Sequence, residues 1–250
     1  MEMKKSYEEQ FTLLTRDCDV NGQWRPSAIL AAMQEAAGAH CTLLGCGRDA
    51  LLQRGIVWIL ARSEVQMDRY PAIGEKVTMQ TFHKPCRLRF FPRYYVFKDG
   101  QGNMVGKAGT LWLLMDIHTR QTIAAGDIAA LLPDNSDIAA PMALPATVGQ
   151  LQGEEVVMPY RPLYTDLDVN GHVNNTRYAD WLCNALGIEA MQRYQLQSLV
   201  LNYNAEVLPD QELTLHLTRQ DDAYRLAGYH EGKVAFEAGG QLRERGRLTQ

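Results

Sequence analysis

Hydrophobic residues recur at helical spacing in two stretches of the chain. The first stretch begins at Pro26 or Ser27, either of which can start a helix. Its apolar stripe consists of Ile29, Met33, Ala36, Ala37, His40, Leu43 and Leu44. The second stretch has Asn174 or Asn175 as a candidate N-cap and ends at Gly187. Its stripe consists of Tyr178, Trp181, Leu182 and Ala185. The pattern predicts one long helix in each half of the chain.

Segments rich in strand-forming residues follow each predicted helix. They are 56–67, 87–97 and 105–115 in the first half and 198–208, 224–230 and 233–242 in the second. Turn residues at 99–102 and 231–232 join the later segments as hairpins. A helix followed by an antiparallel meander, found twice, predicts an α+β fold in which each sheet wraps around a long central helix. In tandem, this arrangement is a double hotdog.

An internal repeat relates the two halves. The sequence Asp-Val-Asn-Gly-Gln at 19–23 returns as Asp-Val-Asn-Gly-His at 168–172. Shorter matches follow in the same order, pairing 74–78 with 210–214 and 102–109 with 232–239. Coincidence is the alternative for any one match, but the shared order favours a tandem duplication.

Prolines and small residues mark the joint between the halves. Five of the ten prolines lie between positions 133 and 162, where an Ala-rich stretch has neither helix nor strand periodicity. We therefore predict an N-terminal hotdog at 1–130, a linker at 131–158 and a C-terminal hotdog at 159–250.

Composition and charge narrow the class of protein. The 250 residues are 46% hydrophobic and 22% charged, which is typical of a globular protein and not of a disordered chain. A net charge of −4 gives no overall attraction to nucleic acid. No run is suited to a membrane span, and the N-terminus lacks a secretory signal, so we expect a cytoplasmic protein. The 5 cysteines have no paired spacing and fit reduced thiols.

The segment 164–175 holds the densest set of chemically capable side chains, just before the second predicted helix. Asp, Asn and Gly are also ordinary turn and capping residues, so a purely structural role is the alternative. His172 adds a group that titrates near neutral pH. Backbone N–H groups at 171–173, near a helix N-terminus, can hold an oxyanion.

Comparing the two copies of the repeat distinguishes residues required for folding from residues required for catalysis. Asp, Asn and Gly occur in both copies, whereas His172 is matched by Gln23, which cannot exchange a proton near neutral pH. The offset of the later strands places Tyr70 opposite Glu206. We therefore predict one working site, in the second half, and a degenerate site in the first.

Three motifs resemble those of the acyl-ACP thioesterases, the plant and bacterial acyl-acyl-carrier-protein hydrolases. The run from Thr165 to Tyr178, with Trp181 following, looks like the signature of that family. The segments 69–77 and 111–120 are also similar to family motifs, and the resemblance extends over residues 6–245.

The resemblance implies a double-hotdog hydrolase that cleaves the thioester of a fatty acyl-ACP and releases a free fatty acid. The catalytic Asp, Asn and His of the family correspond to Asp168, Asn170 and His172, and its downstream Glu corresponds to Glu206. A cysteine follows that Glu in the family motif, but Val207 occupies this position here. A Cys–His nucleophile is therefore excluded at this position, and we expect no covalent thiol catalysis.

Water is then the expected nucleophile. Glu206, directly or through His172, can act as a general base, while Asn170 orients or polarises a reacting group. Asp168 either orients its neighbours or attacks the carbonyl to form an anhydride, and the sequence leaves both roles open.

Substrate contacts are expected in the first half. The resemblance implies that this half shapes the acyl tunnel, which makes Met33, Ala36 and Ala37 candidate lining residues, although plain hydrophobic core is the simpler interpretation. A basic cluster provides a candidate docking surface for an acidic carrier protein, with a solvated strand face as the alternative. It consists of Lys84, Arg87, Arg89 and Arg93, and the last three would share one face of a strand.

Neither a cofactor nor a metal is predicted. The potential metal ligands His40, Cys41, Cys46, His83 and Cys86 form no recognisable four-ligand set, and His40 is expected in the core.

Three other functions stay open as alternatives. They are an acyl-CoA thioesterase, a non-catalytic acyl-carrier-binding module and a hotdog dehydratase. The presence of both His172 and Glu206 argues against a pure binder. The length of the acyl chain and the choice between monomer and homodimer are not determined by the sequence.

Overall fold

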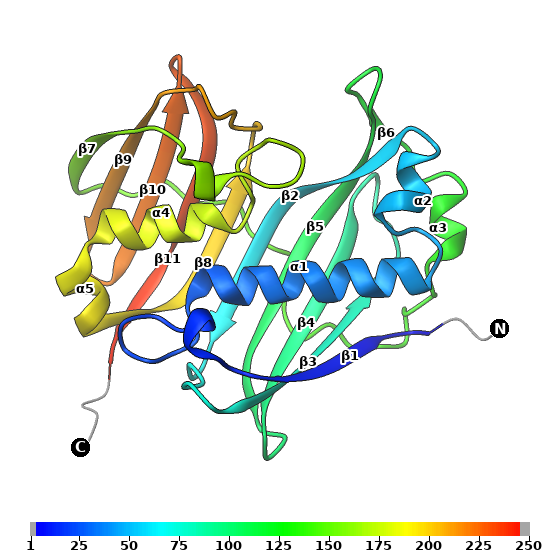
Figure 1. Ribbon diagram of the computed structural model, residues 1–250, viewed down its shortest axis with the longest axis horizontal. Helices are drawn as coiled ribbons and strands as arrows, with labels where there is room; N and C mark the ends of the chain where they lie inside the picture. The colour runs from blue at the N-terminus through cyan, green and yellow to red at the C-terminus, as the bar shows by residue number, and fades with distance from the viewer. Residues whose placement is uncertain (1–3, 246–250) are drawn as a thin grey trace. The chain divides into compact units, whose positions relative to one another are not determined.

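The computed structural model describes residues 4–245 and divides into two compact units, Met1–Pro145 and Ala146–Gln250. Each unit combines an antiparallel sheet with a helix that lies across one face of it (Figure 1). The predicted α+β double hotdog is therefore confirmed. The division falls inside the predicted linker, but that linker is too long at its end, because 154–158 belong to strand β7 (Glu154–Tyr160).

The N-terminal unit is a sheet with the strand order β1–β3–β4–β5–β2, and the short β6 pairs with β5. Its strands are β1 (Tyr7–Thr12), β2 (Ile56–Met67), β3 (Lys76–His83), β4 (Phe91–Asp99), β5 (Met104–Asp116) and β6 (Thr122–Ile123). Its helices are η1 (Thr15–Asp17), α1 (Pro26–Leu43), α2 (Arg48–Leu52) and α3 (Ile128–Leu131). Among the described residues, no helix is long and apolar enough to cross a membrane.

Helix α1 begins where the sequence predicts. Pro26 takes the first helical position, where its missing N–H costs no hydrogen bond and its fixed φ suits the helix. The predicted stripe is buried from Ile29 to His40, and small alanines in it let the helix lie close to the sheet. Leu43 is the exception, since it is 56% exposed while Leu44 is buried.

The C-terminal unit contains antiparallel strands in the order β8–β11–β10–β9–β7. Its other strands are β8 (Tyr194–Tyr203), β9 (Leu213–Gln220), β10 (Ala223–His230) and β11 (Lys233–Glu244). Its helices are η2 (Tyr164–Asp166), α4 (Arg177–Leu186) and α5 (Ile188–Arg193). Gly187, with φ of +89°, separates α4 from α5, as expected of a helix-ending glycine.

Helix α4 begins later than predicted. Asn174 is not its N-cap, because the Asn174 Oδ1 accepts hydrogen bonds from the backbone N–H and the hydroxyl of Thr176, at 3.0 and 2.9 Å. This local turn delays the first helical residue to Arg177. Tyr178, Trp181 and Leu182 are buried as predicted.

Two strands also differ from their predicted bounds. β8 ends at Tyr203 because the next two amides, of Asn204 and Ala205, both donate to the carbonyl of Ala235 at 2.9 Å. Glu206 therefore lies on a loop and not on the strand. β4 begins at Phe91 and not at residue 87, because 87–90 form a tight turn.

Candidate active site

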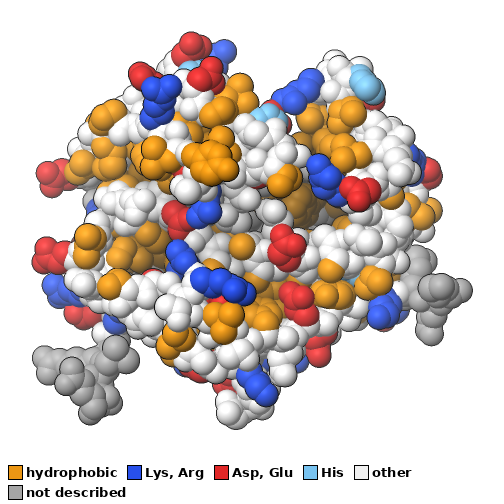
Figure 2. Space-filling model, viewed as in Figure 1, with side chains coloured by type: hydrophobic (Ala, Val, Ile, Leu, Met, Phe, Trp, Pro, Cys, Tyr) orange, Lys and Arg blue, Asp and Glu red, His pale blue; other side chains and the backbone are white. Residues whose placement is uncertain are grey.

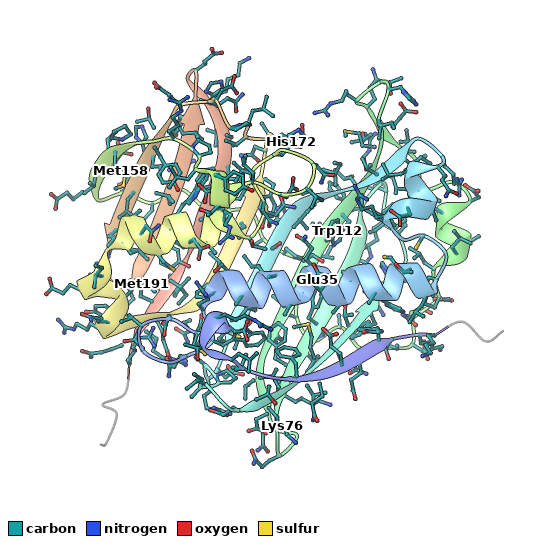
Figure 3. The ribbon with its side chains drawn as sticks, in the orientation of Figure 1. Glu35, Lys76, Trp112, Met158, His172 and Met191 are labelled. Carbon is teal, nitrogen blue, oxygen red and sulfur yellow. The ribbon has the colours of Figure 1, made fainter. Side chains whose placement is uncertain are left out.

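The loop before α4 is held in shape by the carboxylate of Asp168. Oδ1 accepts from the backbone N–H of Asn170 at 2.8 Å and from that of His172 at 3.3 Å. Oδ2 accepts from the Asn170 side-chain amide at 3.2 Å. Gly171 adopts φ of +78°, a conformation that favours glycine, and its N–H donates to the Asp168 carbonyl. These bonds form an Asx-type turn that presents His172 (Figure 3).

The N-terminal unit contains the same turn. Asp19 Oδ1 accepts from the N–H groups of Asn21 at 2.8 Å and Gln23 at 3.1 Å, and Oδ2 accepts from the Asn21 amide at 3.2 Å. Gly22 has φ of +70°. The two copies therefore share their hydrogen bonds as well as their sequence. Asp, Asn and Gly serve the turn in both units, and only the last position, Gln23 or His172, differs in chemistry.

Each turn is also joined to the segment after a later strand. In the C-terminal unit the N–H of Val173 donates to the carbonyl of Val207, and in the N-terminal unit the N–H of Trp24 donates to that of Pro71. This correspondence pairs Glu206 with Tyr70, as the sequence offset predicts. Tyr70 is buried, whereas Glu206 is exposed to solvent.

His172 and Glu206 form the one pair of acid–base groups that the predicted site residues bring together. Their Nδ1 and Oε1 atoms are 3.8 Å apart, and their side chains are 31% and 33% exposed. The distance is within the range of an ion pair and slightly longer than a direct hydrogen bond. Since both groups are open to solvent, a water molecule can reach them and exchange protons with them.

The predicted oxyanion donors at 171–173 form hydrogen bonds within the protein. The N–H groups of Gly171, His172 and Val173 already donate to the protein, the first two to Asp168 and the third to Val207. Among the amides of 170–177, that of Asn175 alone forms no hydrogen bond with a residue that the structure describes. It lies just before α4, where the helix dipole favours negative charge.

Comparison with known proteins shows to which family the chain belongs. The model of the acyl-ACP thioesterase N-terminal domain matches residues 4–130, and that of the C-terminal domain matches residues 149–242. The chain belongs to the acyl-ACP thioesterase family. Both domain types of the family are thus present, in order, and the family resemblance of the sequence motifs is confirmed.

Individual acyl-ACP thioesterases are distant relatives of this chain. It is 24% identical over 228 residues to the chloroplastic palmitoyl-acyl carrier protein thioesterase of Gossypium hirsutum, which covers 86% of this chain and 55% of that protein. It is also 24% identical over 248 residues to oleoyl-acyl carrier protein thioesterase 2 of Arabidopsis thaliana, covering 91% and 68%. The chain spans about half the length of most curated relatives that it matches.

Solved structures of the family share the fold. An acyl-ACP thioesterase from Bacteroides thetaiotaomicron matches with a TM-score of 0.85 at 23% identity, covering 96% of this chain and 98% of that one. The 12:0-ACP thioesterase from Umbellularia californica matches with a TM-score of 0.82 at 20% identity, covering 97% and 98%. These similarities establish the double hotdog architecture.

Two tyrosines beside this thioesterase-family site were not assigned a role from the sequence. The Tyr203 hydroxyl donates to the carbonyl of Asn175 at 3.2 Å, and the rings of Tyr203 and Tyr178 are 5.6 Å apart. Burial, followed by the nearby Tyr203 and Glu206, raises the pKa of Tyr178, which keeps its phenol protonated. Tyr178 is the last residue of the family signature that begins at Thr165, and that position was the available signal.

The four residues of the predicted basic cluster do not lie on one surface. Arg93 is only 1% exposed, so its assignment to a docking surface is wrong. The Nζ of Lys84 donates to the carbonyls of Asn135 at 2.5 Å and Ile138 at 2.6 Å. These bonds hold the ammonium group against the backbone of its own unit. Arg87 and Arg89 are exposed on the turn before β4 and not on the strand. The face drawn in Figure 2 shows Lys and Arg scattered among Asp and Glu, without a broad basic region.

The remaining predicted residues lie inside the N-terminal unit. Met33, Ala36 and Ala37 are buried on α1, where they pack as core. His40 is also buried, as predicted. In the part of the chain that the structure describes, no three His, Cys, Asp or Glu side chains are grouped so as to hold a metal ion.

Proposed function

We propose that this member of the family hydrolyses the thioester of a fatty acyl-acyl carrier protein and releases the fatty acid and the free carrier. The observation that carries the proposal is the pair formed by His172 and Glu206, 3.8 Å apart and open to solvent. The equivalent turn of the N-terminal unit has the same hydrogen bonds but neither ionisable group. Selective retention of an acid–base pair on one of two matching turns supports catalysis there.

The geometry supports general-base attack by water. Glu206 takes a proton from a water molecule, directly or through His172, and the water oxygen attacks the thioester carbonyl carbon. The C–S bond then breaks, and the thiol of the carrier leaves with the proton that the pair returns. Because Val207 has no thiol, no covalent intermediate can form at the position next to Glu206, and water attacks directly.

The surrounding polar groups divide into supporting roles. Asp168 receives three hydrogen bonds from its own turn, which favours an orienting role over attack on the carbonyl. The exposed Asn170 amide uses one N–H for Asp168, and its second N–H can bind the substrate oxygen. The N–H of Asn175, which donates to no residue in the described part of the chain, is the backbone donor that we assign to the oxyanion.

An acyl-CoA substrate is the nearest alternative, because the chemistry at the thioester is the same. The names of the relatives, all acyl carrier protein thioesterases or hydrolases, favour the carrier protein. Acyl chain length, a tunnel lined by Met33, Ala36 and Ala37, a cytoplasmic location and a monomeric or dimeric state remain predictions.

The deciding experiment is release of free fatty acid from acyl-ACPs of several chain lengths and from the matching acyl-CoAs. We expect wild-type turnover of acyl-ACP, with Glu206→Gln greatly reduced. Faster turnover of acyl-CoA at equal concentration would favour the CoA alternative. Binding of acyl-ACP without turnover would show a non-catalytic carrier-binding protein.

A further inference from the structure

A second cluster of chemically capable side chains is buried in the N-terminal unit, between α1 and strands β3 and β4. At its centre is the guanidinium of Arg93, from β4. It donates to His40 Nδ1 at 3.2 Å, to Thr81 Oγ1 at 3.1 Å and to Cys41 Sγ at 3.3 Å, and it also contacts His83 Nε2. The proposed hydrolysis uses none of these residues.

The charge of Arg93 needs a counter-ion. A guanidinium is protonated at any physiological pH, and burial of an uncompensated charge costs several kcal/mol. None of the described partners of Arg93 is a carboxylate. The charge must therefore be balanced by one of the groups that Arg93 contacts.

The two imidazoles cannot supply the negative charge. His40 donates its Nε2 proton to the carbonyl of Lys4 at 3.0 Å, which leaves Nδ1 to accept from Arg93. Burial, followed by the charge of Arg93, lowers the pKa of His83 to about 4 and also lowers that of His40. Both rings are thus neutral acceptors, and Cys41 is the acidic group that remains.

Cys46 is positioned to stabilise a thiolate at Cys41. Gly45, with φ of +77°, turns the chain back at the end of α1, and the N–H of Cys46 donates to the Cys41 carbonyl at 2.9 Å. The indole of Trp58 donates to the Cys46 carbonyl at 3.0 Å and fixes that residue. The hydrogen bond from the Cys46 thiol, followed by the effects of His83 and Arg93, lowers the pKa of Cys41 against the opposing effect of burial.

We propose that Cys41 is the thiolate counter-ion of Arg93 and that Cys41 and Cys46 form a dithiol that peroxides oxidise to a disulfide. The Cys41 sulfur attacks the O–O bond of hydrogen peroxide, takes one oxygen as a sulfenic acid and releases hydroxide. The Cys46 sulfur then attacks the Cys41 sulfur, the S–S bond forms, and the sulfenic oxygen leaves as water. The two sulfurs together lose two electrons, which the peroxide gains.

Burial makes this site selective for small oxidants. Cys41 is 7% exposed and Cys46 is fully buried. Hydrogen peroxide is close to water in size, whereas bulky disulfide reagents cannot reach either sulfur in the folded chain. Oxidation also removes the negative charge beside Arg93. The disulfide should therefore destabilise the N-terminal unit, contrary to the usual effect of a disulfide.

Peptide mapping of the full-length protein tests the chemistry. After hydrogen peroxide, acid quenching and alkylation, we expect a peptide with 41 and 46 linked and a lower melting temperature. Cys46→Ser should instead leave a sulfenic acid at Cys41 that dimedone labels once the chain is unfolded, whereas Cys86→Ser, at a partly exposed cysteine, should leave the 41–46 link unchanged. Free thiols at 41 and 46 after a dose that oxidises Cys86 would overturn the proposal.

A matched pair of variants tests whether Arg93 needs a negative charge at position 41. Asp and Asn have almost the same shape, so Cys41→Asp and Cys41→Asn differ mainly in whether Arg93 keeps an anion. We expect Cys41→Asp to melt roughly 5 °C or more above Cys41→Asn. The difference should disappear in the Arg93→Met background. Equal stability of the pair with Arg93 present would show that no counter-ion is needed.

Discussion

The backbone N–H of Val173 donates to the carbonyl oxygen of Val207 at 3.0 Å. Each partner directly follows a residue of the acid–base pair, His172 on one side and Glu206 on the other. One backbone hydrogen bond therefore fixes the separation of the two ionisable groups. Side-chain variants at His172 and Glu206 can change the chemistry while this link between the two loops stays in place.

Removing either ionisable group should abolish turnover without unfolding the chain. We expect His172→Gln and Glu206→Gln each to lower kcat for acyl-ACP by about 100-fold to 10,000-fold, because each removes a general acid–base group. Both side chains are about one third exposed, so melting temperatures should change little. Gln23→Ala, at the matching position of the other unit, is the control, and an equal loss of activity there would contradict the one-site assignment.

The two Asp residues of the turns should have equal structural and unequal catalytic importance. Asp168→Ala and Asp19→Ala each remove an acceptor of three hydrogen bonds and should lower the free energy of unfolding by about 1–3 kcal/mol. Only Asp168→Ala should also lower kcat, measured well below its melting temperature. A catalytic effect of Asp19→Ala at matched stability would argue that the N-terminal turn takes part in turnover.

What remains of the predicted docking surface is the turn before β4. Arg87 and Arg89 are exposed there on both sides of Leu88, which is 99% exposed. Charge complementarity with an acidic carrier protein predicts that Arg87→Glu raises KM for acyl-ACP several-fold and leaves KM for acyl-CoA unchanged. Arg48→Glu, at another exposed position of the same unit, should change neither value. Equal KM shifts for both substrates would remove this turn from carrier recognition.

Acid should destabilise the chain through His83. Burial and the charge of Arg93 lower its folded-state pKa to about 4, against about 6.5 in the unfolded chain. Between these values the unfolded state binds the extra proton, so the contribution of His83 is present above pH 6.5 and lost as pH falls to 4. The full loss is about 3 kcal/mol.

Urea denaturation at several pH values measures this loss. His83→Gln keeps an acceptor for Arg93 and should reduce the pH dependence of stability between pH 4 and 6.5, leaving the part that the lowered pKa of His40 contributes. His118→Gln, at an exposed histidine, should leave it unchanged. A wild-type stability that is constant over this range would show that His83 keeps its ordinary pKa in the folded chain.

The sequence predicted the features that depend on local periodicity. β2 has its predicted bounds, α1 starts at Pro26, and the repeat at 19–23 and 168–172 marks two turns with the same hydrogen bonds. The errors arise where local bonds end an element early. Asn174 forms a side-chain turn that postpones α4, and Ala235 accepts two amides that end β8.

The site was predicted less completely because its details depend on contacts between distant segments. Arg93 looks like a surface residue from the alternation with Arg87 and Arg89, but it is buried because α1 and β3 supply its hydrogen-bond partners. Likewise, the sequence predicts that the N–H of Val173 is available for an oxyanion, and only the fold shows that it donates to Val207. Neither contact leaves a signal at its own position in the sequence.

The N-terminal unit keeps the turn that carries His172 in the C-terminal unit, but without the ionisable side chain. Asp19, Asn21 and Gly22 already build the loop, and the bond from Trp24 to Pro71 already fixes the spacing on which a His and a Glu would stand. The residues that form the turn are therefore distinct from the ionisable residues that it carries. The two turns differ in chemistry at two matched pairs of positions, Gln23 against His172 and Tyr70 against Glu206.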